Sequence, residues 1–200
     1  MAYEAGYRVE ANDRIALVVA AFYNVYKHLL SLDNPDPSLP LDFLEDNDFH
    51  GNTYGVEVGA TLKVADWWTV RTAYTYLQMQ LRPDPGSTDT TTAASEGNSP
   101  NNQVSVRSSM TLPHNLELDL TGRYVDRLSG FDSLHIAGTT DTVPAYISLD
   151  ARIGWRPNEH LEIAVVGQNL LDSQHPEFGA GGPNRHEVPR SVYGMVTYRW

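Results

Sequence analysis

The sequence predicts an all-β fold, an antiparallel up-and-down meander of about nine long strands. Three observations support this prediction. Apolar residues recur at every second position through most of the chain. Short turns alternate strictly with long polar loops. Most of the alternating segments are about ten to fourteen residues long, whereas strands of soluble sheets usually have about five or six.

The first two strands differ in clarity. Residues 3–10 alternate between apolar side chains and charged or small ones, and a tight turn follows at Asn12 and Asp13. Residues 14–30 are ambiguous, because their apolar positions fit a strand and a helix equally well. The long strands and alternating turns expected in the rest of the chain favour a strand here too.

Four clearer strands occupy the middle of the chain. Each carries valine, leucine or aromatic residues on one face and polar residues on the other. Short turns at Ala65-Asp66 and around His114 join them into two hairpins. These strands cover residues 54–64, 68–76, 103–112 and 116–124.

The last three strands cover residues 146–155, 161–167 and 188–200. The final strand ends on the alternating residues Val196, Tyr198 and Trp200. The ends of soluble chains usually fray, so a terminal tryptophan there has little to pack against. A wall that faces lipid explains it better, because the ring sits at headgroup level. An ordinary terminal strand of a soluble barrel is the alternative.

The turns and loops are expected on opposite rims of the sheet. The short turns lie near Asn12, Asp66, His114 and Asn158, and the long loops cover residues 31–50, 82–102, 126–143 and 172–187. Within the first loop, residues 43–50 read either as loop or as an irregular strand start. Bacterial outer-membrane barrels combine short periplasmic turns with long extracellular loops. Their strands need about 9–11 residues to cross the membrane.

The composition excludes several classes of protein. At 41% hydrophobic residues and a mean hydropathy of −0.37, the 200-residue chain is too polar for a helical membrane protein. No secretory leader is visible, which predicts a mature or truncated piece, or a cytoplasmic protein. The lack of cysteine excludes disulfides and cysteine-based zinc sites. A net charge of −11 argues against nucleic acid as a partner.

Aromatic residues gather near both rims. All four tryptophans lie within a few residues of the short-turn rim, and many tyrosines lie near the long-loop rim. Two membrane interfaces would select such belts, whereas aromatics in a sandwich core would cluster in the middle of the strands. The expected interface residues are Trp68 and Trp155 at one rim and Tyr74, Tyr76 and Tyr124 at the other.

Possible sites of chemistry are weak. His175, Glu177, His186 and Glu187 share a loop, but their spacing is not that of a zinc site. The run from Gly179 to Gly182 is followed by no helix signal, so it is not a phosphate cradle. Ser148, Asp150 and His160 lie near one hairpin, yet nothing marks a nucleophile. We therefore expect no enzyme activity, no cofactor, and neither catalytic nor metal residues.

The charged side chains of the strands share the face opposite the apolar one. They include Arg71, Arg107, Arg123 and Arg152, with Glu57, Glu117, Asp119 and Asp150. Such a set can be a charged interior that contacts another domain or a substrate. It can equally be a ladder of cross-strand ion pairs that faces water, which is the favoured interpretation for any single residue.

Several stretches resemble the barrel of TonB-dependent outer-membrane receptors. The most specific are Gly167-Gln168-Asn169-Leu170-Leu171-Asp172 and the closing Pro189-Arg190-Ser191-Val192-Tyr193-Gly194, in this order before a terminal aromatic strand. Weaker matches are Tyr3–Arg8, Phe22–Tyr26, Tyr54–Glu57 and Ala73–Leu77. The resemblance covers nearly the whole chain.

The resemblance implies that residues 1–200 are a C-terminal fragment of a larger transmembrane β-barrel of the 22-stranded type, without the plug domain. It implies TonB-dependent uptake of a scarce nutrient, such as a ferric siderophore, across the bacterial outer membrane. The implied partners are the lipid bilayer, the ligand, and TonB through the missing N-terminal plug region. In that family the terminal strand is also the address for the outer-membrane assembly machinery. The matching positions are Val192, Val196, Tyr198 and Trp200, although Gly194 departs from a fully hydrophobic pattern.

Two alternatives remain at this point. The chain could be a soluble all-β ligand-binding barrel of lipocalin type, or a complete small porin-like barrel. The two faces of the strands discriminate, because a soluble barrel puts its aliphatic side chains inside and its charges outside. A membrane barrel does the reverse. A porin-like barrel also needs an even number of strands and closure.

Overall fold

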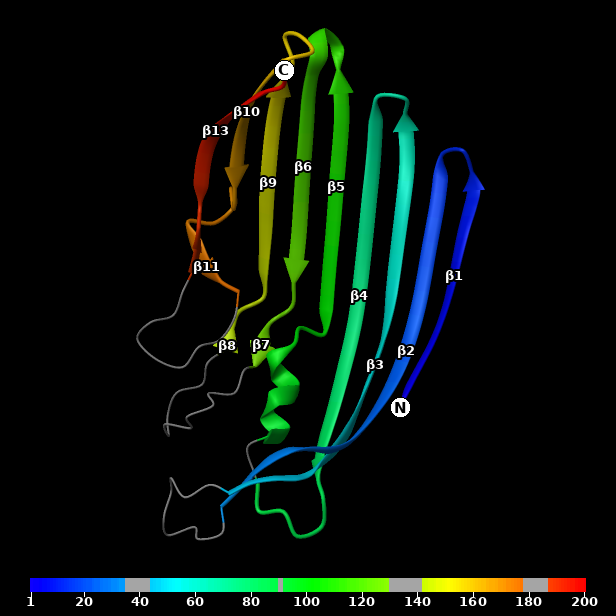
Figure 1. The fold of residues 1–200 in the computed structure, drawn as a ribbon, viewed down its shortest axis with the longest axis vertical. Helices are drawn as coiled ribbons and strands as arrows, with labels where there is room; N and C mark the ends of the chain where they lie inside the picture. The colour runs from blue at the N-terminus through cyan, green and yellow to red at the C-terminus, as the bar shows by residue number, and fades with distance from the viewer. Residues whose placement is uncertain (35–43, 90–91, 130–141, 178–186) are drawn as a thin grey trace.

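The computed structural model describes residues 1–34, 44–89, 92–129, 142–177 and 187–200. Nine long strands form one antiparallel sheet, in which each strand pairs with the next long strand along the chain (Figure 1). They are β1 (Ala2–Asn12), β2 (Ile15–Asp33), β3 (Leu44–Ala65), β4 (Trp68–Pro83), β5 (Asn102–Leu112), β6 (Leu116–Val125), β9 (Tyr146–Trp155), β10 (Leu161–Gln168) and β13 (Ser191–Tyr198). The predicted all-β meander of nine long strands is confirmed.

The ambiguous segment is a strand. β2 pairs with β3 from Ile15 to Asp33 and with β1 as far as Asn24. Ala21, for example, lies opposite Val56 on one side and Ala5 on the other. Backbone hydrogen bonds to two neighbours settle a choice that the apolar pattern of this segment left open.

The first long loop is shorter than predicted. The sequence predicts a loop over residues 31–50, with a loop or an irregular strand start left open for residues 43–50; β2 continues to Asp33, and β3 begins at Leu44, which confirms the strand start. In this extension Ser31 pairs with Asp46. Polar contacts support the ladder there, since the Ser31 hydroxyl accepts a bond of 3.2 Å from the Asp48 N–H. The pairing of β2 with β3 therefore extends beyond the segment with alternating apolar residues. The alternation ends where the strands no longer need a lipid-facing surface. Residues 35–43 lie outside the described residues.

The other long loops contain short elements of their own. A 3₁₀ helix, η1 (Thr92–Asn98), follows β4. Two small hairpins pair β7 (Leu128–Ser129) with β8 (Thr142–Val143), and β11 (Gln174–Pro176) with β12 (Glu187–Pro189). All these elements gather at the rim opposite the short turns (Figure 1). None of the described helices has the length and hydropathy needed to cross a membrane.

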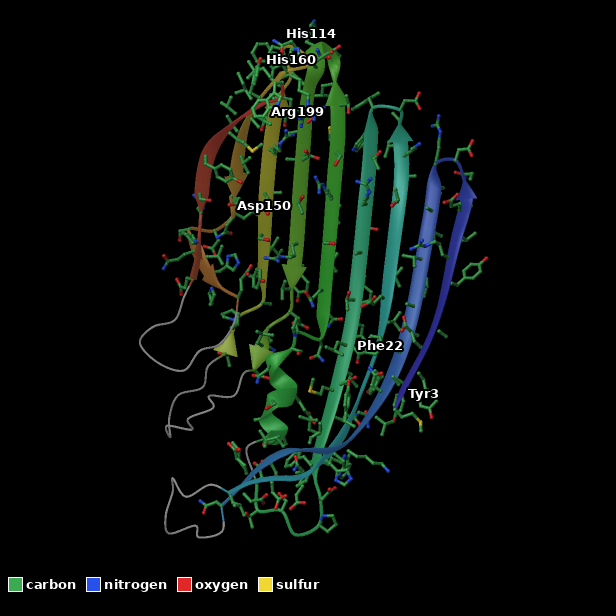
Figure 2. All side chains as sticks on the ribbon, in the orientation of Figure 1. Tyr3, Phe22, His114, Asp150, His160 and Arg199 are labelled. Carbon is green, nitrogen blue, oxygen red and sulfur yellow. The ribbon has the colours of Figure 1, made fainter. Side chains whose placement is uncertain are left out.

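The short turns behave as predicted. The turn between β5 and β6 is a single 3₁₀ turn, η2 (Pro113–Asn115), in which His114 and Asn115 have φ of 63° and 58°. Asparagine tolerates this left-handed region better than most residues, which suits it to a tight reversal. His114, His160 and Arg199 all lie at this rim (Figure 2).

The register of the sheet brings the apolar residues onto one continuous face. Directly paired residues point the same way, and Val58 pairs with Tyr74, which pairs with Val104 on the next strand. The same row continues to Tyr124 and Ile147. Charged residues form equivalent rows on the other face. One face therefore offers hydrocarbon and the other offers charge.

The apolar face lies uncovered in the part of the chain that the structure describes. Ile153, Val165 and Val196 on the apolar face are 57%, 55% and 69% exposed. On the charged face Glu162 is only 8% exposed and Ser148 only 6%. Burying polar groups while exposing a broad aliphatic surface is the reverse of a soluble barrel. This distribution contradicts the soluble alternative and agrees with a wall that faces lipid.

The described residues form no compact core. Few of their apolar side chains are buried, and most of these belong to the long-loop rim. They are Phe49, Val125, Leu128 and Val143, with Ala164 on the charged face. β1 and β13 are the two edges of the sheet, each paired on one side only within the described residues. The nine strands therefore make a curved open wall, and no separate plug-like domain occurs among the residues described.

Candidate functional site

The charged face carries an ion-pair network near the short-turn rim. Arg152 Nη1 on β9 lies 3.0 Å from Glu117 Oε2 on β6 and 3.5 Å from Asp119 Oδ2. Its other terminal nitrogen, Nη2, binds Glu162 on β10. Arg156 Nη2 and Nε lie 3.2 Å from Glu117 and Glu162, respectively. The network thus joins three neighbouring strands, and we name it the rim network.

The rim network is balanced in charge. Arg199 Nη2 lies 3.6 Å from Glu162 Oε2, so three arginines meet three carboxylates. Gly154 makes room for the centre of the network, because a Cβ there would lie 2.7 Å from Arg152 Nη2. Buried ion pairs stabilise only when the remaining polar atoms are also satisfied, and here several guanidinium nitrogens find carboxylates.

A second polar cluster lies on the same face near the long-loop rim. The Arg123 guanidinium on β6 and the Tyr146 hydroxyl on β9 both donate to Glu177, the residue after β11. The His175 ring stacks on Tyr146 with centroids 4.2 Å apart. Asn169, with φ of 50°, donates from its backbone N–H to Asp150 at 2.9 Å and from its side chain to the Val188 carbonyl at 3.0 Å. The cluster fastens the chain that follows β10 to the sheet.

The pKa values of aspartates at the long-loop rim, beyond the aromatic belts, are shifted in both directions. Burial raises the pKa of Asp48, and the nearby Asp46, Asp33 and Asp84 raise it further. A hydrogen bond from the Asn102 side chain lowers the pKa of Asp126 more than burial raises it. This rim therefore holds some carboxylates firmly as anions and crowds others together.

The structure places the predicted interface aromatics at the two rims. Trp68 begins β4 and donates from Nε1 to the Ser108 hydroxyl at 2.8 Å, and Trp155 ends β9. Tyr74 and Tyr124 lie on the apolar face towards the long loops, where their hydroxyls donate to Asn102 and Asp126 at 2.9 Å and 3.4 Å. Tyr76 pairs with Asn102 one step further along.

The proposed assembly residues lie at the end of the sheet. Val192, Val196 and Tyr198 share the apolar face of β13, and all are exposed. The Tyr198 ring lies 6.2 Å from that of His160. Trp200 follows the end of the strand and is fully exposed.

Among the described residues, the side chains of the rejected catalytic and metal sites form no such site. Asp150 lies within its strand, whereas His160 lies at the short-turn rim (Figure 2). His175 Nε2 is 3.6 Å from Glu177 Oε1, but the described residues contain no group of three or more candidate metal ligands. His186 and the run from Gly179 to Gly182 lie outside those residues.

Sequence reasoning missed part of the rim network. It placed Arg152, Glu117 and Asp119 on the charged face but did not single out Glu162 or Arg156. For Glu162 a signal existed, because it alternates with the apolar Leu161 and Ile163. Arg156 lies after the end of β9, where period-two alternation no longer predicts a direction.

Solved structures share this fold. The FrpB iron transporter from Neisseria meningitidis (F3-3 variant) is 17% identical with a TM-score of 0.76, covering 98% of this chain and 30% of its own. The siderophore receptor PiuA from Acinetobacter baumannii is 21% identical with a TM-score of 0.74, covering 98% and 28%. The pyoverdine outer membrane receptor FpvA from Pseudomonas aeruginosa PAO1, solved with pyoverdine, is 17% identical with a TM-score of 0.76, covering 100% and 29%. At these identities the likeness shows the fold alone.

The sequence itself identifies the family. No curated protein matches the chain. Residues 1–170, however, match the sequence model of the family described as TonB dependent receptor-like, beta-barrel. The chain spans less than a third of the three solved receptors named above, so it corresponds to one part of such a barrel. The chain therefore belongs to the TonB-dependent receptor family, as part of a barrel wall of the bacterial outer membrane.

Proposed function

We propose that residues 1–200 form the C-terminal part of the barrel of a receptor that takes up a scarce nutrient, such as a ferric siderophore. The observation that carries this proposal is the division of the sheet into an exposed aliphatic face and a charged face. In a membrane barrel the first contacts acyl chains and the second lines the water-filled interior. The proposal includes no covalent chemistry and no enzyme activity.

The two rims give the wall a direction. Short turns of outer-membrane barrels face the periplasm and long loops face the outside. The rim network then lies in the periplasmic half of the interior, and the Arg123–Glu177 cluster lies in the outer half. A nutrient arriving from outside would first meet the long loops and the cluster beneath them.

Similarity of the fold to solved transporters and receptors supports the proposed ligand class. The similar structures include an iron transporter, a siderophore receptor and a receptor bound to pyoverdine. Because their sequence identity to this chain is low, the ligand of this chain is to be identified by a direct uptake assay. We propose that TonB supplies the drive through an N-terminal plug region of the complete polypeptide, as the family membership suggests.

Two groups of residues have proposed roles outside transport. Trp68, Trp155, Tyr74, Tyr76 and Tyr124 would anchor the wall at the two membrane interfaces, since their rings lie near the rims. Three of them, Trp68, Tyr74 and Tyr124, also hydrogen-bond through their polar atoms. Val192, Val196, Tyr198 and Trp200 would present the terminal strand to the assembly machinery.

Uptake in the native host tests the transport proposal. Cells are starved of iron and offered a panel of radiolabelled ferric catecholates and hydroxamates. We expect uptake of at least one of them to fall on deletion of this gene and equally on deletion of the TonB gene. Re-expression of the complete gene should restore it.

Two results would contradict the proposal. Unchanged uptake of the whole panel in the gene deletion would remove siderophores as the ligand class. Uptake that depends on this gene but not on TonB would point to the porin-like alternative, because passive pores need no energy.

A further inference from the structure

Three arginines surround a hollow on the charged face of the first five strands. The hollow has a volume of about 440 Å³, and Arg8 of β1, Arg71 of β4 and Arg107 of β5 line it. We name these residues the arginine triad. All three are exposed, although the chain as a whole carries a net charge of −11. A cluster of three cations is unexpected in a chain with so large a negative net charge.

The register forces two of these cations together. Arg71 lies directly opposite Arg107 on the neighbouring strand, so both side chains leave the same face of the sheet. Like charges directly opposite each other destabilise an antiparallel pair. A sheet keeps such a pair readily only when an anion offsets the repulsion.

Nearby carboxylates neutralise the triad only in part. Arg107 Nη2 lies 3.4 Å from Asp119 Oδ1, but Asp119 also accepts a bond of 2.7 Å from Ser109 and belongs to the rim network. Glu10 lines the hollow as well. Arg8 and Arg71 make no ion pair with any of the residues that the structure describes. The triad therefore retains positive charge.

The rim network provides an internal comparison. It lies on the same face and contains the same number of arginines, yet each of them meets at least one carboxylate within 3.6 Å. The sheet can therefore satisfy arginines when their role is structural. In the triad only Arg107 has such a partner among the described residues, and Arg8 and Arg71 have none.

Small residues keep the triad accessible. Ala16, Gly59, Ala73 and Ser105 line the hollow between the arginines. Their short side chains leave room for an occupant to approach the guanidinium planes. A guanidinium presents two parallel N–H groups, which match the oxygens of a carboxylate or a phosphate.

The geometry points to the arginine triad as an anion site that takes a carboxylate or phosphate group. Arg71 and Arg107 would bind the group from adjacent strands, and Arg8 would approach it from β1. The group could come from an acidic side chain of another part of the complete polypeptide, or from a free anionic solute. The inference rests on the proposed function only in that this face borders water.

Chemical footprinting tests the site on the complete receptor in its native membranes. Phenylglyoxal modifies accessible, unpaired arginines, and mass spectrometry gives the rate at each position. Arg14 serves as the reference, because it is exposed and its side chain lies outside the hollow. Citrate is the probe for a free carboxylate, with sodium chloride of equal ionic strength as its control.

Two patterns would support the site and distinguish its sources. If an acidic side chain occupies it, Arg71 and Arg107 react about tenfold more slowly than Arg14 without any added anion, the worth of a charged hydrogen bond. Salt at 1 M, where screening acts within about 3 Å, then restores their reactivity. If the site takes a free solute, both react quickly until citrate slows them saturably.

Two other patterns would overturn it. Rates equal to that of Arg14 with and without citrate would mean that the triad is simply solvated. Slow rates that high salt leaves unchanged would mean steric shielding without an anion.

Matched variants give a second readout. Arg71→Gln should weaken citrate protection of Arg107 about tenfold, or remove its salt-sensitive protection, whereas Arg14→Gln should change neither. Equal behaviour of the two variants would count against the site. Footprinting and uptake are separate measurements. A negative footprinting result would therefore contradict the anion site without contradicting the transport proposal.

Discussion

At the scale of single residues, Asp33 shows how one carboxylate organises the long-loop rim. It lies at the end of β2 and accepts hydrogen bonds from the Ser31 and Ser87 hydroxyls at 2.9 Å and 2.8 Å. The backbone N–H groups of Thr88 and Asp89 also donate to it. Burial raises the pKa of Asp33, but these hydrogen bonds outweigh burial and hold the pKa below its ordinary value.

This lowered pKa predicts a pH dependence for the segment after β4. The stabilisation is fully present above the unfolded carboxyl pKa of about 3.9, and it is lost as pH falls through the lower folded value. At neutral pH, Asp33→Asn should speed hydrogen exchange at Thr88 and Asp89 by about tenfold, because a charged acceptor becomes neutral. Hydrogen exchange monitored by mass spectrometry on the complete receptor measures this.

Asp13→Asn is the control, since Asp13 lies in the exposed turn at the other rim. It should leave exchange at Thr88 and Asp89 unchanged. A difference between Asp33→Asn and the unmodified protein that persists at pH 2 would contradict the role of ionisation.

At the scale of elements, each strand divides its residues between lipid and water. On β5, Val106 pairs with Thr72 and Gly122 on the exposed face, and Gln103 pairs with Thr75 and Val125 on the charged one. The alternation along the strand predicts that two such faces exist. Cross-strand register is what aligns the faces of nine strands into two surfaces.

A pair of lysine substitutions on β5 tests this division. Val106→Lys should destabilise the barrel by about 2–4 kcal/mol, the cost of a lysine facing the middle of the bilayer. Gln103→Lys, on the same strand but facing water, should have a much smaller effect. Urea unfolding of the complete receptor in lipid vesicles measures both. Equal destabilisation would mean that the apolar face does not contact lipid.

The same scale shows why the ends of β2 and β3 escaped prediction. Period-two alternation reports burial or lipid contact, not strand pairing itself. Beyond Leu30 on β2 and before Tyr54 on β3 the apolar alternation is lost, while the backbone ladder continues to the pair Asp33 and Leu44. The prolines and aspartates near this rim predict a loop. Backbone pairing between β2 and β3, which are far apart in the sequence, instead makes these extensions strands.

At the scale of the whole molecule, the sheet is an open wall with β1 and β13 at its edges (Figure 1). An unpaired edge exposes backbone donors and acceptors, which a membrane barrel satisfies by closure. The edge at β13 also carries the proposed assembly residues. Its apolar face bears Tyr198, and the opposite face bears Tyr193.

One experiment separates the assembly role from the interface role. Tyr198→Ser should reduce the amount of folded receptor in the outer membrane to a small fraction, whereas Tyr193→Ser, on the opposite face of β13, should leave it nearly normal. Trp155→Ser should leave the amount largely intact but lower the unfolding temperature, because an interface anchor is lost. Heat-modified mobility on gels reports both quantities.

Two results would contradict these roles. Equal loss of folded receptor in the two tyrosine variants would exclude recognition of one face of the strand. An unchanged unfolding temperature for Trp155→Ser would remove this tryptophan from the interface belt.

The sequence by itself determined the class of fold, the number of long strands, the two rims and the two faces. It could do so because strands alternate with period two, and because lipid and water select opposite side chains. The motif around Asn169 resembles that of the family without reference to the fold. These are local signals, each readable within about ten residues.

Only the tertiary structure decided which charged residues meet. The register places Arg71 against Arg107 and gathers Glu117, Arg152 and Glu162 from three strands. It also settled β2 as a strand and extended it to Asp33. The physical reason is that contacts across a sheet depend on the alignment of segments far apart in the chain. A shift of one residue would turn every side chain to the other face, and no single strand records that alignment.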